Sequence, residues 1–145
     1  MEKHELLSGR TIEFDLGTKE LAGFVASARE QLKDPKVKSP QFMALVLGPD
    51  NPLREKKKDA LRRDPVYLLL LDLFDRKRLM EGKLNLDNTM ARYTMTVKEA
   101  AAELGMAPSS VRRAISSNRL GAWRFKGGFR LSPEQVETYK NNMSR

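Results

Sequence analysis

The chain has 145 residues, with 27 Lys or Arg against 19 Asp or Glu and a net charge of +8. The absence of cysteine excludes disulfides and thiolate metal sites, and a single histidine, His4, makes zinc binding or His-based catalysis a poor expectation. The N-terminus has no hydrophobic stretch, so we do not expect a secretory signal. The apolar run from Val66 to Leu71 is too short to cross a bilayer. The basic charge favours a polyanionic partner, chiefly nucleic acid or an acidic membrane surface. We expect a cytoplasmic, nucleoid-associated protein that binds DNA and no membrane, without metal or cofactor.

The first third of the chain predicts helices with one short strand. Residues 1–10 have the character of a polar lead-in, and His4 falls within it. Alternation of apolar and polar residues from Thr11 to Leu16 predicts a strand. Thr18 can then cap an amphipathic helix that runs from Lys19 to Lys33.

A second, shorter helix is predicted after Ser39-Pro40. Its apolar residues are Phe42, Met43, Val46 and Leu47. Two prolines and a glycine between Gly48 and Pro52 cannot continue a helix, so the helix must end there.

The middle of the chain predicts a basic helix followed by an apolar one. Residues Arg54 to Arg63 include six Lys or Arg, which form either a solvated face or an auxiliary contact to phosphate. Residues Val66 to Met80 are apolar almost all round, which indicates a helix buried on several sides. We expect that helix to form the core of an N-terminal domain, either alone or with an additional role as a subunit interface. Residues 83–93 have the composition of a linker, in which Leu84 and Leu86 allow a short strand.

A strongly marked helix start follows at Thr96. Thr96 and Glu99 have the spacing of a capping box, and Val97, Ala100 and Leu104 lie on one apolar stripe. Gly105 can end this helix in the left-handed conformation. Pro108 then suits the first position of the next helix, where its missing N–H has no partner to lose.

The helix that begins at Pro108 separates an apolar face from a polar one. Val111, Ala114 and Ile115 fall on the core side. The remaining side chains are short hydroxyls and guanidinium groups, which can reach phosphates and base edges. They are Ser109, Ser110, Arg112, Arg113 and Ser116.

A basic β-hairpin is predicted next. Trp123 and Phe125 alternate with Arg124 and Lys126, and Gly127-Gly128 is a suitable two-residue turn. On this reading Arg124, Lys126 and Arg130 share the wet face, while Phe129 and Leu131 return on the apolar face. The aromatic rings pack in the core in preference to stacking on bases. Ser132-Pro133 then starts a final helix.

Residues 94–142 resemble the excisionase-type helix-turn-helix family, a branch of the MerR-like winged helices. The matching residues are Glu99-Ala100-Ala101, Leu104-Gly105, Pro108, Val111-Arg112-Arg113, Ile115, Arg119-Leu120, Ala122, Gly127-Gly128, Arg130, Ser132-Pro133 and Glu134. Ala107 departs from the pattern, because the family usually has a Ser or Thr cap at this position. The resemblance implies DNA binding, with the second helix in the major groove and the hairpin wing against the backbone.

The expected fold class is mainly α with small β elements (α+β). We expect an N-terminal helical domain over residues 1–82, for dimerisation or partner binding, a linker over residues 83–93, and a winged helix-turn-helix over residues 94–145. The DNA-binding residues would be Ser109, Ser110, Arg112, Arg113, Ser116, Arg124, Lys126 and Arg130.

The leading hypothesis is a sequence-specific double-stranded DNA-binding protein, a transcriptional regulator acting as a homodimer or cooperative oligomer. Within DNA binding, the alternatives are a phage or mobile-element factor of the excisionase or packaging type, or an antitoxin whose N-terminal region binds a partner protein. From another class, the N-terminal region would be an enzyme that the C-terminal module delivers to DNA. The first 93 residues contain one His and no Cys, so we do not expect an enzyme.

Overall fold

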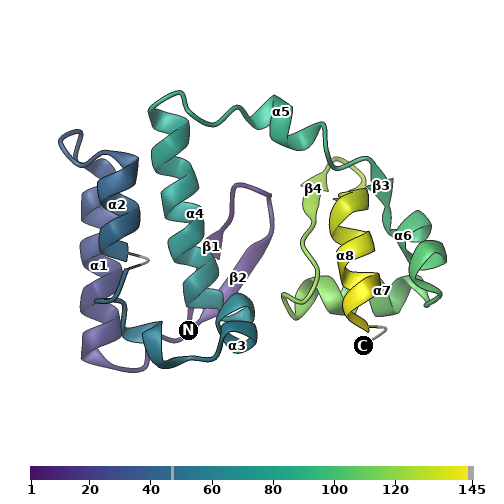
Figure 1. Ribbon diagram of the computed structural model, residues 1–145, viewed down its shortest axis with the longest axis horizontal. Helices are drawn as coiled ribbons and strands as arrows, with labels where there is room; N and C mark the ends of the chain where they lie inside the picture. The colour runs from purple at the N-terminus through teal and green to yellow at the C-terminus, as the bar shows by residue number, and fades with distance from the viewer. Residues whose placement is uncertain (47, 144–145) are drawn as a thin grey trace. The chain divides into compact units, whose positions relative to one another are not determined.

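A computed structural model describes residues 1–46 and 48–143 (Figure 1). The chain forms two compact units. One comprises Met1–Leu7 and Thr11–Asn85, and the other comprises Ser8–Arg10 and Leu86–Arg145. Both are mainly helical with a small antiparallel sheet, which confirms the predicted α+β class. No helix in the described ranges has the length and apolar character needed to span a bilayer.

The N-terminal unit combines a two-stranded hairpin with helices. Its elements are β1 (Glu2–Glu5), β2 (Thr11–Phe14), α1 (Lys19–Lys33), α2 (Ser39–Val46), the 3-10 helix η1 (Pro52–Glu55), α3 (Lys58–Arg63) and α4 (Pro65–Met80). The Thr18 hydroxyl caps α1 by accepting from the Leu21 N–H, as predicted. Asp64 caps α4 by accepting from the Val66 and Tyr67 N–H groups, and Pro65 occupies the first turn.

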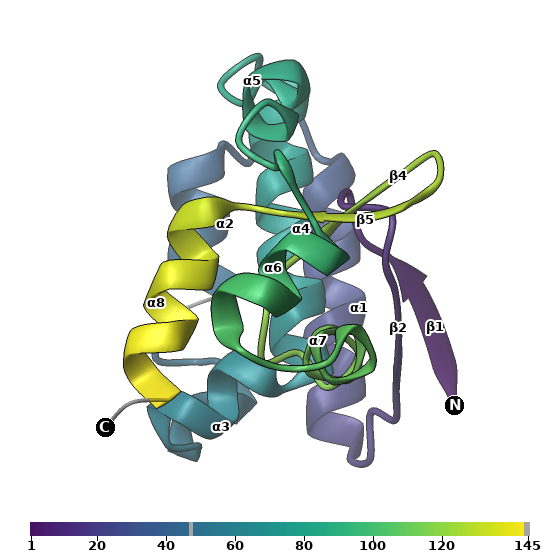
Figure 2. The same cartoon turned by 90° about the vertical axis from the view of Figure 1, so that its right-hand side faces the viewer.

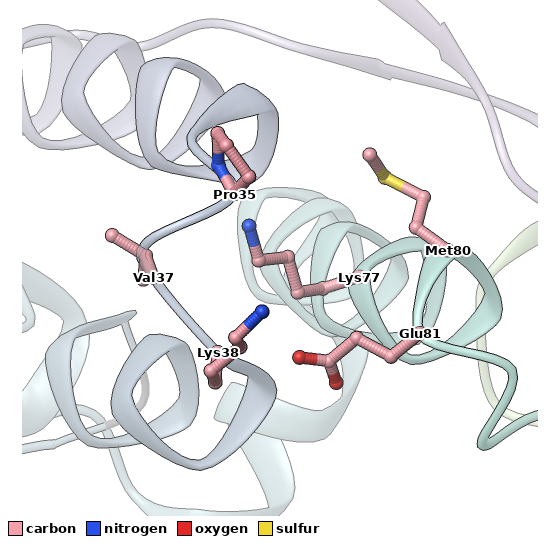
Figure 3. Close-up of a pocket in the computed structure, with 6 residues that line it drawn as sticks. All are labelled: Pro35, Val37, Lys38, Lys77, Met80 and Glu81. Atoms are coloured by element: carbon pink, nitrogen blue, oxygen red, sulfur yellow. The ribbon is translucent and has the colours of Figure 1, made fainter.

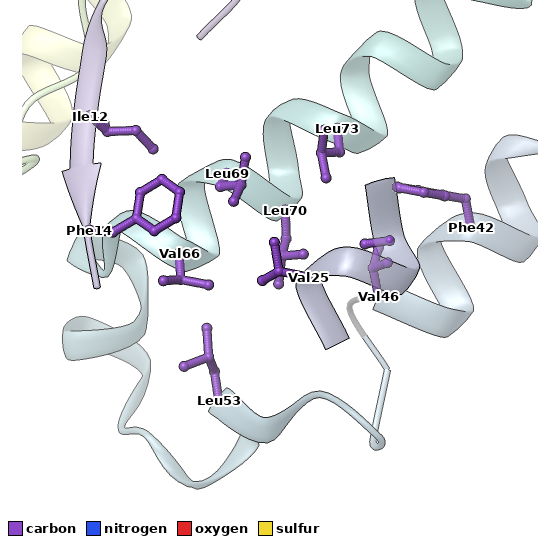
Figure 4. Packing of buried hydrophobic residues seen from close by; sticks show 11 residues of the cluster. Ile12, Phe14, Val25, Phe42, Val46, Leu53, Val66, Leu69, Leu70 and Leu73 are labelled. Atoms are coloured by element: carbon purple, nitrogen blue, oxygen red, sulfur yellow. The ribbon is translucent and has the colours of Figure 1, made fainter. Parts of the chain in front are cut away.

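The core of this unit is built around α4. Leu69 and Leu70 of α4 are fully buried in one cluster with Val25 of α1 and Phe42 of α2, and Figure 4 shows Leu70 beside Val25 and Leu69 beside Phe14 of β2. Burial of each such side chain contributes about 1.5–3 kcal/mol. The prediction that Val66 to Met80 forms a helix at the centre of the N-terminal domain is thus confirmed.

The polar lead-in predicted for residues 1–10 is wrong, because Glu2–Glu5 form strand β1 and pair antiparallel with β2. The single predicted strand is therefore a two-stranded hairpin. Nothing in an all-polar stretch signals a strand, and long-range contacts fix this one. Asp72 of α4, only 6% exposed, accepts from Leu7 N–H at 2.8 Å and lies 2.7 Å from His4 Nε2.

Three other features differ from the sequence prediction. The basic helix expected from Arg54 is divided into η1 and the shorter α3, which begins only at Lys58. The linker contains helix α5 (Leu86–Met90) where a strand was allowed. Met43, expected on the apolar side of α2, is 49% exposed, and Leu47 lies outside the described residues.

A buried lysine closes the C-terminal end of α1. Lys77 is 4% exposed, and its Nζ donates to the carbonyl oxygens of Gln31, Leu32 and Asp34 at 3.1, 3.1 and 2.6 Å. These carbonyls stabilise the ammonium group because the last carbonyls of a helix carry unsatisfied negative character. Lys77 borders a hollow of about 210 Å³ (Figure 3). Since its three N–H donors are engaged, Lys77 has a structural role.

The C-terminal unit surrounds a three-stranded antiparallel sheet in the order β3-β5-β4. After α5 its elements are β3 (Met95–Thr96), α6 (Val97–Leu104), α7 (Pro108–Ser116), β4 (Trp123–Phe125), β5 (Gly128–Leu131) and α8 (Pro133–Met143). Its core combines Ala100 of α6, Val111 and Ile115 of α7, Leu131 of β5 and Val136 of α8. In Figure 2, α7 is seen nearly end-on and the β4–β5 hairpin extends away from α8.

Candidate nucleic-acid interface

The first helix of the pair, α6, is fixed at both ends by the residues predicted for this role. Thr96 Oγ1 accepts from the Glu99 N–H at 3.0 Å, and Glu99 Oε1 accepts from the Thr96 N–H at 3.0 Å. These two hydrogen bonds, together with the charge of Arg130, hold the pKa of Glu99 below its ordinary value. Gly105 ends α6 with a φ of 67°, in the left-handed region that favours glycine.

The second helix, α7, begins without a side-chain cap. Pro108 occupies its first turn, and Ala107 stands at the N-cap position with no hydrogen bond from its side chain. An alanine at this position forgoes about 1 kcal/mol of helix stability compared with Ser or Asp. The N-terminal N–H groups of α7 are therefore less well satisfied than those of α6.

The faces of α7 agree with the sequence prediction. Val111, Ala114 and Ile115 are at most 1% exposed. The side chains predicted to bind DNA lie away from this core: Ser110 is half-buried, and Ser109, Arg112, Arg113 and Ser116 are exposed. The helix thus presents two guanidinium groups and three hydroxyls beside a fully packed apolar face.

The β4–β5 hairpin has a different register from the predicted one. Phe125 pairs with Gly128, so the two turn residues are Lys126 and Gly127, and the predicted Gly127-Gly128 turn is wrong. Gly127 has a φ of 101°, which suits a glycine at the second position of a two-residue turn. The displaced turn changes which residues pair across the hairpin, but side chains keep their faces, because the pairing slips by two residues.

The hairpin places on opposite faces basic residues that were expected to share one face. Arg130 lies opposite Trp123, whereas Arg124 lies opposite Phe129. Directly paired residues lie on the same face of an antiparallel sheet, so Arg124 and Arg130 lie on opposite faces. Lys126 is exposed in the turn. The prediction of one wet face carrying Arg124, Lys126 and Arg130 is therefore wrong.

The aromatic residues divide in the same way. Phe129 packs against the core of the C-terminal unit, as expected. Trp123 and Phe125 are half-buried on the other face, and the Trp123 ring lies 5.6 Å from that of Tyr93, centroid to centroid. Core packing is thus confirmed for Phe129 and not for Trp123 or Phe125.

A hollow of about 450 Å³ lies between α6, α7 and the hairpin. It brings together Arg112 of α7, Arg130 of β5 and Lys98 of the first turn of α6. Gly127 and Gly128 also line it, so no turn side chain obstructs that edge. Three cationic groups around one opening can hold the oxygen atoms of a phosphate.

Lys98 is the residue of this hollow that was missed in the sequence. The available signal was its place in the first turn of α6, one residue before the capping Glu99. Periodicity places Lys98 off the apolar stripe but does not indicate that α6 begins beside α7 and the hairpin.

Most basic residues of this surface are not paired with a carboxylate; Arg130, whose charge acts on Glu99, is the exception. Among the described residues, Lys98, Arg112, Arg113, Arg124 and Lys126 form no ion pair. Residues 94–145 contain nine Lys or Arg and four Asp or Glu, a net charge of +5. Unpaired surface cations of one sign attract a polyanion. No group of three metal-binding side chains occurs in the described ranges.

The comparison with known families decides what kind of domain this is. Residues 94–144 match the family model of a helix-turn-helix domain. The match covers about a third of the chain and confirms the resemblance predicted for this segment. It identifies a helix-turn-helix of the DNA-binding kind, with α6 and α7 as its two helices. No curated protein and no solved structure matches the chain.

Proposed function

We propose that the protein is a sequence-specific double-stranded DNA-binding protein that acts as a transcriptional regulator. In this proposal α7 enters the major groove and the β4–β5 hairpin acts as a wing against the DNA backbone. The observation that carries the proposal is the polar face of α7, where exposed Arg112 and Arg113 stand without ion-pair partners beside a fully buried apolar face.

The roles of the individual side chains follow from their chemistry. Arg113 is the residue we assign to a base edge, because a guanidinium group can bind guanine through two hydrogen bonds. Ser109, Ser110 and Ser116 have hydroxyl groups that can contact phosphate or either kind of base. Arg112 faces the hollow between the helices and the hairpin, which supports a phosphate contact for it.

The hairpin and the hollow would bind the backbone. Arg130 and Lys98 would join Arg112 on one phosphate, and Lys126 at the hairpin turn would contact another. Arg124 lies on the face opposite Arg130, so we assign it the weakest of the backbone contacts. These contacts add affinity without reading sequence.

We further propose that two copies act together, with residues 1–82 as the dimerisation or partner-binding domain, residues 83–93 as the linker and residues 94–145 as the DNA reader. A single helix-turn-helix reads few base pairs, and specificity commonly comes from two half-sites about 10 base pairs apart or a multiple of that spacing. The N-terminal unit exposes Met43 and Leu45 of α2, at 49% and 44%, which supports an association role.

The experiment compares binding to a site selected from genomic DNA with binding to random duplex. Arg113→Ala should weaken binding to the selected site by about 1–3 kcal/mol and leave random binding nearly unchanged. Lys126→Ala should weaken both to a similar degree. Lys140→Ala on α8, whose amine lies 3.4 Å from Glu103, is the control and should change neither. Equal affinity of the wild type for selected and random DNA would reject sequence-specific reading.

A further inference from the structure

The N-terminal unit has a basic surface that is separate from the helix-turn-helix. It comprises the last two residues of η1, the two residues that follow, helix α3 and its C-cap Asp64, and is called the basic segment here (residues 54–64). All six of its Lys and Arg side chains are exposed: Arg54, Lys56, Lys57, Lys58, Arg62 and Arg63. Helix α3 has no buried residue, so packing does not account for this composition.

The basic segment accounts for the entire positive charge of the first 93 residues. Residues 1–93 contain eighteen Lys or Arg and fifteen Asp or Glu, a net charge of +3. The basic segment contains six Lys or Arg and three Asp or Glu, which is also +3. The other residues of this region carry twelve charges of each sign and are neutral overall. The charge is therefore concentrated in one short surface element.

Part of this charge is compensated locally and part is not. Lys56 pairs with Asp64, and Arg54 lies 3.8 Å from Glu55. The side chains of Lys57, Lys58 and Arg62 form no ion pair or hydrogen bond within the described residues. These three side chains are the part of the segment that is available to a polyanionic partner.

We propose that Lys57, Lys58 and Arg62 bind the phosphate backbone of the same DNA that the helix-turn-helix reads; this inference rests on the proposed function. The helix-turn-helix holds DNA near the basic segment at high effective concentration, so even weak contacts add affinity. Ammonium and guanidinium groups without hydroxyl or amide neighbours suit phosphate contacts that are independent of sequence.

A membrane surface is a poorer partner for the same charges. Binding in the plane of a bilayer requires a broad apolar face opposite the basic one. Of the apolar residues in the basic segment, Leu61 packs against the core of the N-terminal unit, which leaves Ala60 as the exposed one. The segment therefore matches a backbone of fixed charges better than a lipid interface.

The test is the salt dependence of DNA binding by the full-length protein. The variant Lys57→Gln/Lys58→Gln/Arg62→Gln is compared with wild type on a random-sequence duplex several helical turns long. The slope of log affinity against log salt should become shallower by about 2.7, at about 0.9 for each lost phosphate contact. Raising the salt from about 50 to about 200 mM should then weaken wild-type binding about 40-fold more than it weakens binding of the variant.

Two controls separate local charge from total charge. Lys19→Gln/Lys33→Gln/Lys36→Gln removes three exposed charges elsewhere on the N-terminal unit and should leave the slope close to that of wild type. Lys57→Arg/Lys58→Arg/Arg62→Lys retains the charges and should retain the slope. An unchanged slope in the Gln variant, or an equal change in the first control, would overturn the inference.

The outcomes also distinguish this inference from the proposed function. If wild type prefers its selected site and the Gln variant has the wild-type slope, the inference fails and the proposed function stands. If wild type shows no site preference but the slopes differ, sequence-specific reading fails and the backbone contact stands. If the Gln variant loses the wild type's binding to phosphatidylserine vesicles while its DNA binding is unchanged, the segment binds a membrane and the inference fails.

Discussion

Arg130 lies directly opposite Trp123 in the β4–β5 hairpin, on the face of the sheet that carries Phe125 and not on the face of Phe129. This relationship follows from a turn made by Lys126 and Gly127. It gives the basic residues of the hairpin unequal positions, because Arg130 borders the hollow beside Arg112 while Arg124 lies on the opposite face.

The first prediction concerns these two arginines. Arg130→Ala should make the slope of log affinity against log salt shallower by about 1, as expected for the loss of one phosphate contact. Arg124→Ala, with the same change in charge, should alter the slope by less than half as much. Binding titrations of both variants at several salt concentrations provide the measurement. A larger effect at Arg124 would contradict the assigned roles of the two faces.

The second prediction concerns the hairpin turn. Gly127→Ala should lower the free energy of unfolding by about 1–2 kcal/mol, because alanine is strained at a φ of 101°. Gly23→Ala, within α1 and with no atom within 4 Å of the added Cβ, should raise it by about 0.5–1 kcal/mol. Urea unfolding of both variants measures whether the free energy of unfolding falls for the first and rises for the second. A neutral or stabilising Gly127→Ala would show that this turn does not require a positive φ.

The third prediction uses the missing cap of α7. Ala107→Ser should raise the free energy of unfolding by about 1 kcal/mol by accepting from an N–H of the first turn. Ala107→Asp should stabilise the fold similarly but weaken DNA binding, since it places a negative charge at the N-terminal end of the helix proposed to enter the groove of a polyanion. Thermal unfolding and DNA titration of the same two proteins separate these effects. Equal DNA affinity of the two variants would place this end of α7 away from DNA.

The fourth prediction concerns pH. Burial alone would raise the pKa of Asp72, but hydrogen bonds from His4, the Leu7 N–H and Arg76 hold the pKa below its ordinary value of 3.8. Because the pKa of Asp72 is lower in the folded protein than in the unfolded chain, its ionised carboxylate stabilises the fold at pH values above the ordinary pKa. This stabilisation is lost as the pH falls through the lower pKa of the folded protein. Wild type should therefore lose stability below about pH 4, and Asp72→Asn should lose less over this range. At neutral pH the substitution should cost about 1–3 kcal/mol.

Asp75, on the same helix, provides a control, because its pKa is shifted in the opposite direction from that of Asp72. Burial raises the pKa of Asp75, so its protonation on acidification stabilises the fold. Asp75→Asn should remove this gain and steepen the acid-side loss of stability. Free energies of unfolding measured by urea titration at several pH values test both variants. Parallel pH profiles for wild type and Asp72→Asn would exclude the proposed role of Asp72.

Local signals in the sequence were sufficient for much of the C-terminal unit. The Thr96–Glu99 capping box, Gly105 and Pro108 each act within a few residues, so the ends of α6 and the start of α7 could be predicted. The buried stripe of α7 follows from helical periodicity alone. The family resemblance predicted from these residues is confirmed by the match over residues 94–144.

The features that were missed depend on contacts distant in sequence or on one-residue register. Strand β1 has no apolar alternation, and its pairing is supported by Asp72, more than sixty residues away. With two consecutive glycines, Lys126-Gly127 and Gly127-Gly128 are both acceptable turns, and the choice between them changes the cross-strand partners. Arg124 and Arg130 lie on opposite faces with either turn, so the expectation of one shared basic face did not follow from the predicted turn. Lys98 joins the hollow only because three separate elements meet there.

The central claim, that α7 reads a specific duplex sequence, is tested most directly by selecting bound fragments from a genomic DNA library with the full-length protein, against random competitor DNA. Sequence-specific reading by two copies should enrich a few promoter-proximal sites that contain a repeated half-site, spaced by about 10 base pairs or a multiple of that distance. Arg113→Ala should reduce this enrichment, in line with a loss of about 1–3 kcal/mol at the selected site, while general DNA binding persists. Diffuse recovery that disappears as salt is raised, identical for wild type and Arg113→Ala, would contradict the claim.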